Sequence, residues 1–132
     1  MHIILDTHLL LWALYDSNRL PKGFREIVED DDTDIEYSIV SLWETEIKHN
    51  KFPEEYPFNC DDLFRDAQMA GLHMLDLKPM HIGALGGLNK PKEKHNDPFD
   101  RMLIAQAKSE NSYLVTHDKK LDSYNEECVS CI

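Results

Sequence analysis

The chain has 132 residues, 42% hydrophobic and 30% charged, a composition that suits one globular domain spanning residues 1–132. Its net charge of −11 argues against nucleic-acid binding over the surface as a whole, because such binding neutralises phosphates with cations. No apolar run approaches the ~20 residues of a membrane span and no secretory signal is recognisable, so we expect no membrane partner and a cytoplasmic location. Three cysteines are too few, and odd in number, for a disulfide framework.

Predicted strands and helices alternate along the chain. Residues 2–6 form a short apolar strand, and the apolar spacing after it predicts a helix capped by Asp6 or Thr7. The remaining elements follow in order: a helix carrying Phe24, Ile27 and Val28, a strand at 35–40, a helix capped by Ser38 or Ser41 and broken by Pro53 and Pro57, a helix at 61–70, a strand at 72–77, a short helix at 79–85, a loop at 86–96, a helix at 98–109, a strand at 112–116, a helical turn at 121–124 and a strand at 128–132.

This alternation predicts an α/β fold with a central, mainly parallel sheet flanked by helices on both faces, because parallel strands need helical crossovers. Ligands of such sheets bind outside the carboxyl ends of the strands. Asp6 and Asp118 each follow a predicted strand, and Glu44 falls about one turn into the helix after the second strand. Asp100 lies in the first turn of a later helix and reaches this edge only if the preceding chain returns there.

Each acid also has a purely structural explanation. Asp6 can cap its helix, and Asp118 can be a turn residue. Asp97 can cap the helix that Pro98 begins, and Asp100 lies in the favourable field of the N-terminus of that helix. Glu44 can pair with Lys48 one helical turn away. Capping and pairing do not, however, predict that four acids gather at one edge of one sheet. Their conjunction therefore favours a functional site.

Clustered carboxylates repel one another and take up protons unless a cation compensates them. With no lysine or arginine expected at its centre, the cluster predicts a metal, and oxygen ligands favour Mg²⁺ or Mn²⁺ over zinc. Phosphodiester hydrolysis follows from such an ion, which bridges phosphate oxygens and activates water. On the substrate side, Thr7 and Thr116 can orient a metal-bound water or a carboxylate, and Arg101 can clamp a phosphate.

Charge is unevenly distributed along the chain. Residues 90–120 contain seven basic side chains against five acids, so the surround of the site is expected to be basic. Residues 29–36 contain six acids in eight positions, which predicts a solvated loop. A calcium-binding loop is excluded there, because Ile35 stands where a glycine is required and Ser41 where a bidentate glutamate is required.

Four blocks of sequence, at residues 5–12, 41–48, 95–107 and 114–118, resemble in order those of PIN-domain ribonucleases. The likeness is greatest to the VapC-type toxins of bacterial toxin-antitoxin pairs. It implies a PIN fold, Mg²⁺ or Mn²⁺ dependence, endonucleolytic cleavage of RNA, a homodimer and a cognate antitoxin. The acidic quartet of the family is matched by Asp6, Glu44, Asp100 and Asp118, and a further acid, either a metal ligand or a helix cap, by Asp97. Residues 49–58 depart from the shorter, glycine-containing turn of the family.

Two other classes of protein remain as alternatives. The first is a PIN fold kept as a non-catalytic binding or scaffold protein, which the complete acidic quartet disfavours. The second is a phosphotransfer receiver, which needs paired acids after its first strand, where this chain has Asp6 alone. His95 and His117 flank the predicted site and can act in proton transfer, although a packing role is more common for such residues. Cys128 and Cys131 form a single CxxC pair, too weak a signal for a metal site.

Overall fold

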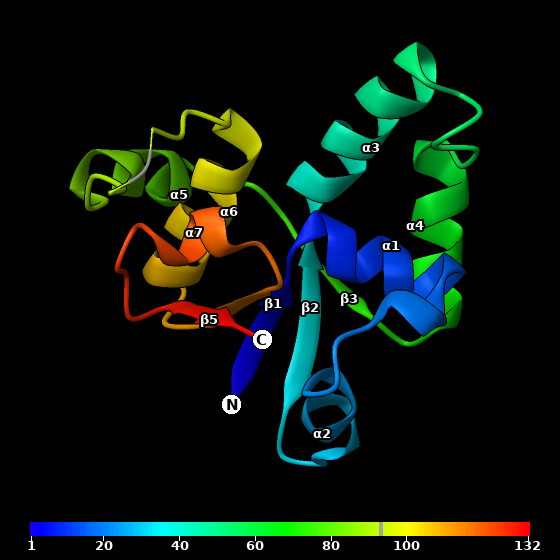
Figure 1. Ribbon diagram of the computed structural model, residues 1–132, viewed down its shortest axis with the longest axis horizontal. Helices are drawn as coiled ribbons and strands as arrows, with labels where there is room; N and C mark the ends of the chain where they lie inside the picture. The colour runs from blue at the N-terminus through cyan, green and yellow to red at the C-terminus, as the bar shows by residue number, and fades with distance from the viewer. Residues whose placement is uncertain (93) are drawn as a thin grey trace.

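The centre of the molecule is a five-stranded, all-parallel sheet in the order β3-β2-β1-β4-β5 (Figure 1). The structure is a computed structural model that describes residues 1–92 and 94–132. Its strands are β1 (His2–Leu5), β2 (Asp34–Ser38), β3 (His73–Leu75), β4 (Tyr113–Thr116) and β5 (Val129–Cys131). The predicted parallel sheet is confirmed, and its order differs from the 2-1-3-4-5 order of receiver folds, which excludes that alternative.

Helices cover both faces of the sheet, as the alternating pattern predicts. In Figure 1, α1, α2 and α4 lie on one side of the sheet and α5, α6 and α7 on the other, while α3 rises from the carboxyl end of β2. The helices are α1 (Thr7–Tyr15), α2 (Phe24–Glu29), α3 (Ile39–Lys51), α4 (Cys60–Met69), α5 (Pro79–Ala84), α6 (Pro98–Ser109) and α7 (Lys119–Asp122), with 3-10 turns at Ser17–Arg19 and Leu85–Gly87. Within the described part of the chain, no helix is long and apolar enough to cross a membrane.

The central strand β1 is apolar on both faces, as a strand buried between two layers must be. Ile3 and Leu5 belong to the hydrophobic cluster on the α1 and α4 side, and Ile4 belongs to the opposite cluster with Leu103 and Ile104 of α6. All five side chains are at most 1% exposed. Burial of this strand fixes the sheet and, with it, the position of the edge where Asp6 follows β1.

Most predicted boundaries hold, and two differ because a capping side chain starts a helix early. Ser38 caps α3 by accepting a hydrogen bond from Val40 N at 3.0 Å, so β2 ends at Ser38 and not at 40. Asp118 caps α7, so that helix begins at Lys119 and not at 121. The first two residues of the predicted loop at 86–96 belong to the 3-10 turn at Leu85–Gly87. Glu93, also within that predicted loop, lies outside the described residues.

Ser38 joins the start of α3 to α6, because its buried hydroxyl also donates to Gln106 Oε1 at 2.5 Å. Replacing Ser38 by alanine removes the cap and leaves a buried amide oxygen without this donor. We therefore expect Ser38→Ala to lower the free energy of unfolding by about 1–3 kcal/mol in urea denaturation. Ser17→Ala, at an exposed serine without a capping hydrogen bond, is the control. An equal loss of free energy of unfolding in both variants would contradict the stabilising role of the Ser38 hydroxyl.

Candidate functional site

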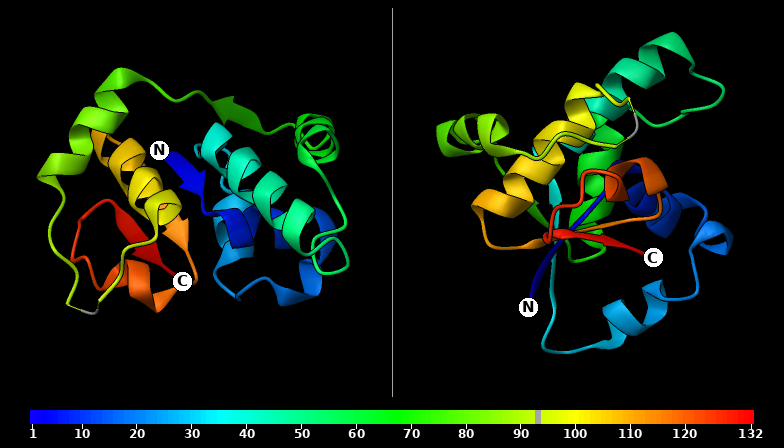
Figure 2. Two further views of the ribbon diagram at one scale, coloured as in Figure 1. Left: turned by 90° about the horizontal axis from the view of Figure 1, so that it is seen from above. Right: turned by 60° about the vertical axis from the view of Figure 1, so that its left-hand side comes forward.

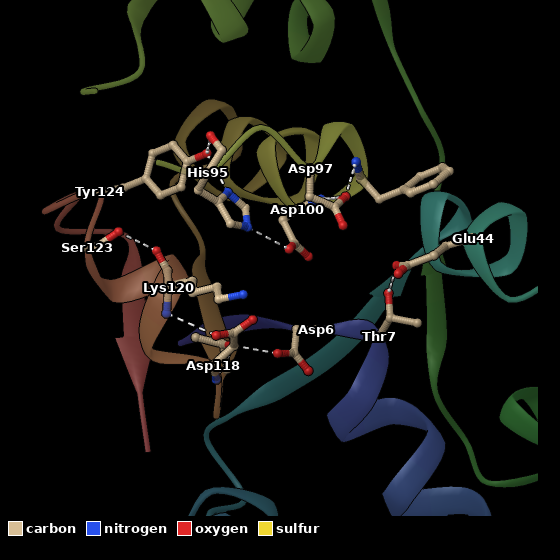
Figure 3. A network of polar contacts seen from close by, with 12 residues as sticks. Asp6, Thr7, Glu44, His95, Asp97, Asp100, Asp118, Lys120, Ser123 and Tyr124 are labelled. Carbon is tan, nitrogen blue, oxygen red and sulfur yellow. Dashed lines mark hydrogen bonds and ion pairs between the residues drawn. The ribbon is translucent and has the colours of Figure 1, made fainter. Parts of the chain in front are cut away.

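Five acids from separate parts of the chain line one pocket of about 220 Å³ at the carboxyl edge of the sheet (Figure 3). Asp6 follows β1, Glu44 lies in α3, Asp97 and Asp100 begin α6, and Asp118 follows β4. Seen from above, α3 and α6 lie on either side of the end of β1 (Figure 2). The segment before α6 thus returns to the carboxyl edge, which was the condition for Asp100 to join the other acids.

Three of the acids are fixed by capping the helix that follows them. Leu9 N donates to Asp6 Oδ1 at 2.8 Å, and Lys120 N donates to Asp118 Oδ1 at 2.9 Å. Asp97 Oδ1 accepts from the first two amides of α6 that it can reach, at 2.9 and 3.2 Å. The structural explanation is therefore correct for these acids, but it does not compete with a functional one, since the same carboxylates also face the pocket.

The two threonines predicted on the substrate side orient carboxylates. Thr116 is fully buried and donates its hydroxyl to Asp6 Oδ2, while Asp118 N donates to Thr116 Oγ1 at 3.0 Å. Thr7 donates to Glu44 Oε1 at 2.7 Å and lies 2.9 Å from the hydroxyl of Ser41. Of the two, only Thr7 lines the pocket. Burial of Thr116 leaves it the role of holding Asp6.

Two lysines lie at the acid pocket, one of them paired as the sequence predicted. Lys48 Nζ lies 2.9 Å from Glu44 Oε2, as the one-turn spacing allows, and Lys120 also lines the pocket. Partial burial lowers the pKa of Lys48, but the hydrogen bond and charge of Glu44 outweigh it and raise that pKa. The predicted pairing of Glu44 with Lys48 is therefore confirmed, and Glu44 is the one acid of the pocket with a lysine partner among the described ion pairs.

The remaining acids are poorly compensated. Burial is the main cause of the raised pKa of Asp6. It outweighs the hydrogen bonds from Thr116 and the Leu9 amide, which lower that pKa. Burial, followed by the charges of Asp97, Glu44, Asp6 and Asp118, raises the pKa of Asp100 to about 8. These carboxylates are therefore held together at a cost that a bound cation would remove.

Arg101 does not lie in the acid pocket. Its guanidinium sits 5.9 Å above the ring of Tyr124, and its side chain lines a separate cavity of about 480 Å³ together with Trp43 and Phe99. The two aromatic rings meet edge to face at 4.9 Å, and Trp43 is 59% exposed. A phosphate clamp by Arg101 therefore requires its side chain to turn toward the acids.

Of the two histidines predicted to flank the site, only His95 lies in the pocket. His95 lines the pocket with Nε2 3.2 Å from Asp100 Oδ2, and its Nδ1 lies 2.8 Å from the hydroxyl of Tyr124 (Figure 3). Tyr124 and Ser41 carried no signal, because their partners are distant in sequence. His117, the second predicted histidine, is exposed and contacts the backbone oxygen of Ile132.

The donor set fits a hydrated hard cation better than a closed metal cage. Among the described residues, no three acidic, histidine or cysteine side chains converge closely enough to form a preformed metal site. Mg²⁺ keeps several of its waters and is commonly bound through one or two carboxylates. The carboxylate oxygens of Asp6, Asp97, Asp100 and Asp118 on the pocket wall therefore have the chemistry for Mg²⁺ or Mn²⁺.

Comparison with known proteins identifies the family. The model of the PIN domain family matches residues 3–127, so the chain belongs to this family. A solved structure of VapBC2 from Rickettsia felis, bound to a DNA fragment from their promoter, matches with a TM-score of 0.70 and 17% identity over 100% of this chain and 98% of that chain. A domain of a functionally unknown protein from Methanocaldococcus jannaschii DSM 2661 matches with a TM-score of 0.57 and 15% identity, covering 99% and 90% of the two chains. At such identities these structures show a shared fold alone. No curated protein sequence matches the chain significantly.

The crowding of the acids predicts a stability effect at Asp100. Its pKa of about 8, against an ordinary value of 3.8, means that the folded state loses stability relative to the unfolded chain as pH rises between these values. We expect Asp100→Asn to raise the thermal midpoint of the EDTA-treated protein by about 3 °C or more near pH 8, with the gain shrinking toward pH 4. Differential scanning calorimetry of the variant and the wild type at several pH values measures the gain and its decrease.

Asp122→Asn is the matched control, because Asp122 is an exposed acid in α7 that does not line the pocket. It should leave the thermal midpoint within about 1 °C of the wild type. A destabilised Asp100→Asn, or the same gain in both variants, would show that the acids of the pocket do not repel one another in the folded protein.

Proposed function

We propose that the protein is an Mg²⁺- or Mn²⁺-dependent endoribonuclease that hydrolyses RNA phosphodiester bonds, and that it is the VapC-type toxin of a toxin-antitoxin pair. The observation that carries the proposal is the gathering of Asp6, Glu44, Asp100 and Asp118 in one pocket of a PIN domain. These residues match the acidic quartet of the nucleases that the sequence resembles.

In this proposal the chain positions a cation and the scissile phosphate against each other. Asp6, Asp100 and Asp118 would hold the ion, with Asp97 close enough to contribute. Such an ion lowers the pKa of a bound water and offsets negative charge on phosphate oxygens. Thr116 keeps Asp6 oriented toward the pocket, and Thr7 keeps Glu44 oriented from the opposite side. Preorganised carboxylates of this kind avoid reorganisation when the cation and substrate arrive.

An RNA substrate requires cations near the pocket despite the net charge of −11. Lys48 and Lys120 line the pocket itself, and Lys90, Lys92 and Lys94 are exposed in the segment that precedes α6. Arg101 would join them by turning away from Tyr124. This local basic surround supports contacts with the phosphates on either side of the cleaved bond.

The antitoxin and a second copy of the chain are the proposed protein partners, in the cytoplasm. Several large apolar side chains are exposed on the helices and loops, and such surface commonly marks protein contacts. The clearest examples are Trp43, Phe52, Phe64, Met69, Met80 and Ile82. All three cysteines are free, in agreement with a reducing compartment.

A non-catalytic scaffold is the competing function, and one observation favours it. The Glu44 carboxylate is already paired with Lys48. In a chain that had lost catalysis, a lysine could neutralise this carboxylate in place of a cation. The carboxylates of Asp6, Asp97, Asp100 and Asp118 have no lysine or arginine partner among the described ion pairs, which weighs toward the nuclease.

Cleavage of a mixed RNA pool by the purified protein tests the proposal. We expect cutting with Mg²⁺ or Mn²⁺, none with EDTA, and a loss of about 10³-fold or more in an Asp6→Asn, Asp100→Asn double variant, since two carboxylates that bind the ion are removed. Fragment patterns on a denaturing gel, followed over time, measure the rate.

The matched control is an Asp61→Asn, Asp122→Asn double variant, which removes the same charge from exposed positions outside the pocket. It should cut at the wild-type rate after identical purification. If a folded wild type that binds Mn²⁺ leaves the RNA intact, or if both double variants cut equally, the nuclease assignment fails and the scaffold remains.

A further inference from the structure

Asp100 differs from the other acids of the pocket in how its side chain is held. Asp6 and Glu44 each accept two hydrogen bonds through their two oxygens, and Asp118 accepts one from the backbone of α7. Asp97 accepts two hydrogen bonds from backbone amides of α6. Among the described residues, the carboxylate of Asp100 has no backbone donor, and its single hydrogen-bonding partner is a side chain, the ring of His95 at 3.2 Å. The direction of this carboxylate therefore depends on one imidazole.

The imidazole is in turn fixed by Tyr124. The Tyr124 hydroxyl lies 2.8 Å from His95 Nδ1, and the two rings meet edge to face at 5.5 Å (Figure 3). Tyr124 is fully buried in the cluster that contains Ile4 and Leu103, and the His95 side chain is only 8% exposed. A buried anchor of this kind limits rotation of the imidazole and leaves its Nε2 facing Asp100.

Hydrogen-bond chemistry then assigns the donor. A carboxylate that binds a cation is ionised and can only accept hydrogen bonds, so His95 Nε2 must carry the proton toward Asp100 Oδ2. The Tyr124 hydroxyl satisfies Nδ1 at the same time. With Oδ2 engaged by His95, Oδ1 of Asp100 would remain available to a cation. Removing the imidazole leaves the Asp100 carboxylate free to rotate.

We propose that His95, anchored by Tyr124, is a positioning residue that orients Asp100 toward a divalent cation and so sets the affinity of the pocket for that cation. The inference rests on the proposed function, because it takes Asp100 as a metal ligand. Residues that orient metal ligands in this way typically alter metal affinity by 10- to 100-fold when replaced.

Three variants separate orientation from packing. His95→Ala removes the donor, and His95→Gln restores a donor because the amide nitrogen of glutamine can reach the place of imidazole Nε2. Tyr124→Phe removes the hydroxyl and keeps the ring. The segment around His95 stays attached in all three through the hydrogen bond from Lys92 N to Ser123 O at 3.1 Å.

The primary readout is the Kd for Mn²⁺, measured by electron paramagnetic resonance on metal-free protein at one fixed pH. We expect His95→Ala to weaken binding about tenfold or more and Tyr124→Phe to weaken it severalfold. His95→Gln should stay within about threefold of the wild type. The thermal midpoint without metal should not follow this ranking, because the ranking reflects orientation of one ligand and not stability of the fold.

Two control variants probe similar groups outside the pocket. Tyr15→Phe removes a hydroxyl that donates to Asp66 at 2.5 Å, and His49→Ala removes an imidazole that contacts the backbone oxygen of Tyr56 at 2.7 Å. Both should bind Mn²⁺ like the wild type.

The outcomes distinguish this inference from the proposed function. Wild-type affinity in His95→Ala would overturn the inference, and so would a loss in His95→Gln as large as that in His95→Ala. Either result leaves RNA cleavage by the wild type unaffected. Absence of Mn²⁺ binding in the wild type itself would instead contradict the proposed function, and the inference with it.

Discussion

The candidate site depends on carboxylates held close together at one edge of a parallel sheet, against their mutual repulsion. Adjacent strands β1 and β4 place Asp6 and Asp118 side by side, and α3 and α6 bring Glu44 and Asp100 over the ends of these strands. Burial and the neighbouring charges raise the pKa of Asp100 to about 8. The layers on both faces of the sheet supply the free energy that keeps this arrangement folded, since they bury Ile3, Ile4 and Leu5 of β1.

Helix capping and the proposed metal site use the same residues. Asp6, Asp97 and Asp118 each satisfy amides at the start of a helix, so that the local structure fixes them before any ligand arrives. A helix start also favours negative charge, which lessens the cost of crowding. Side-chain donors complete the arrangement: Thr116 holds Asp6 and His95 holds Asp100. The proposed cation would therefore meet carboxylates whose directions are already limited.

Local and periodic features were predictable from the sequence. The strand-to-helix alternation predicted the parallel sheet, and Pro98 after Asp97 predicted the start of α6 at the observed residue. The acids at strand ends followed from the same pattern. Contacts between distant segments were not predictable: the pairs Ser38–Gln106 and His95–Tyr124 join residues 68 and 29 positions apart. Nothing in the spacing indicated that Lys120 would line the pocket or that Arg101 would lie over Tyr124.

The central claim is that this pocket binds the divalent cation. Anomalous diffraction from a crystal soaked in Mn²⁺ tests it most directly, because the signal locates the ion independently of any assay. The account predicts a peak within bonding distance of carboxylate oxygens from Asp6, Asp100 or Asp118, and its loss in Asp100→Asn. A peak only outside the pocket, with the pocket intact and accessible, would contradict it.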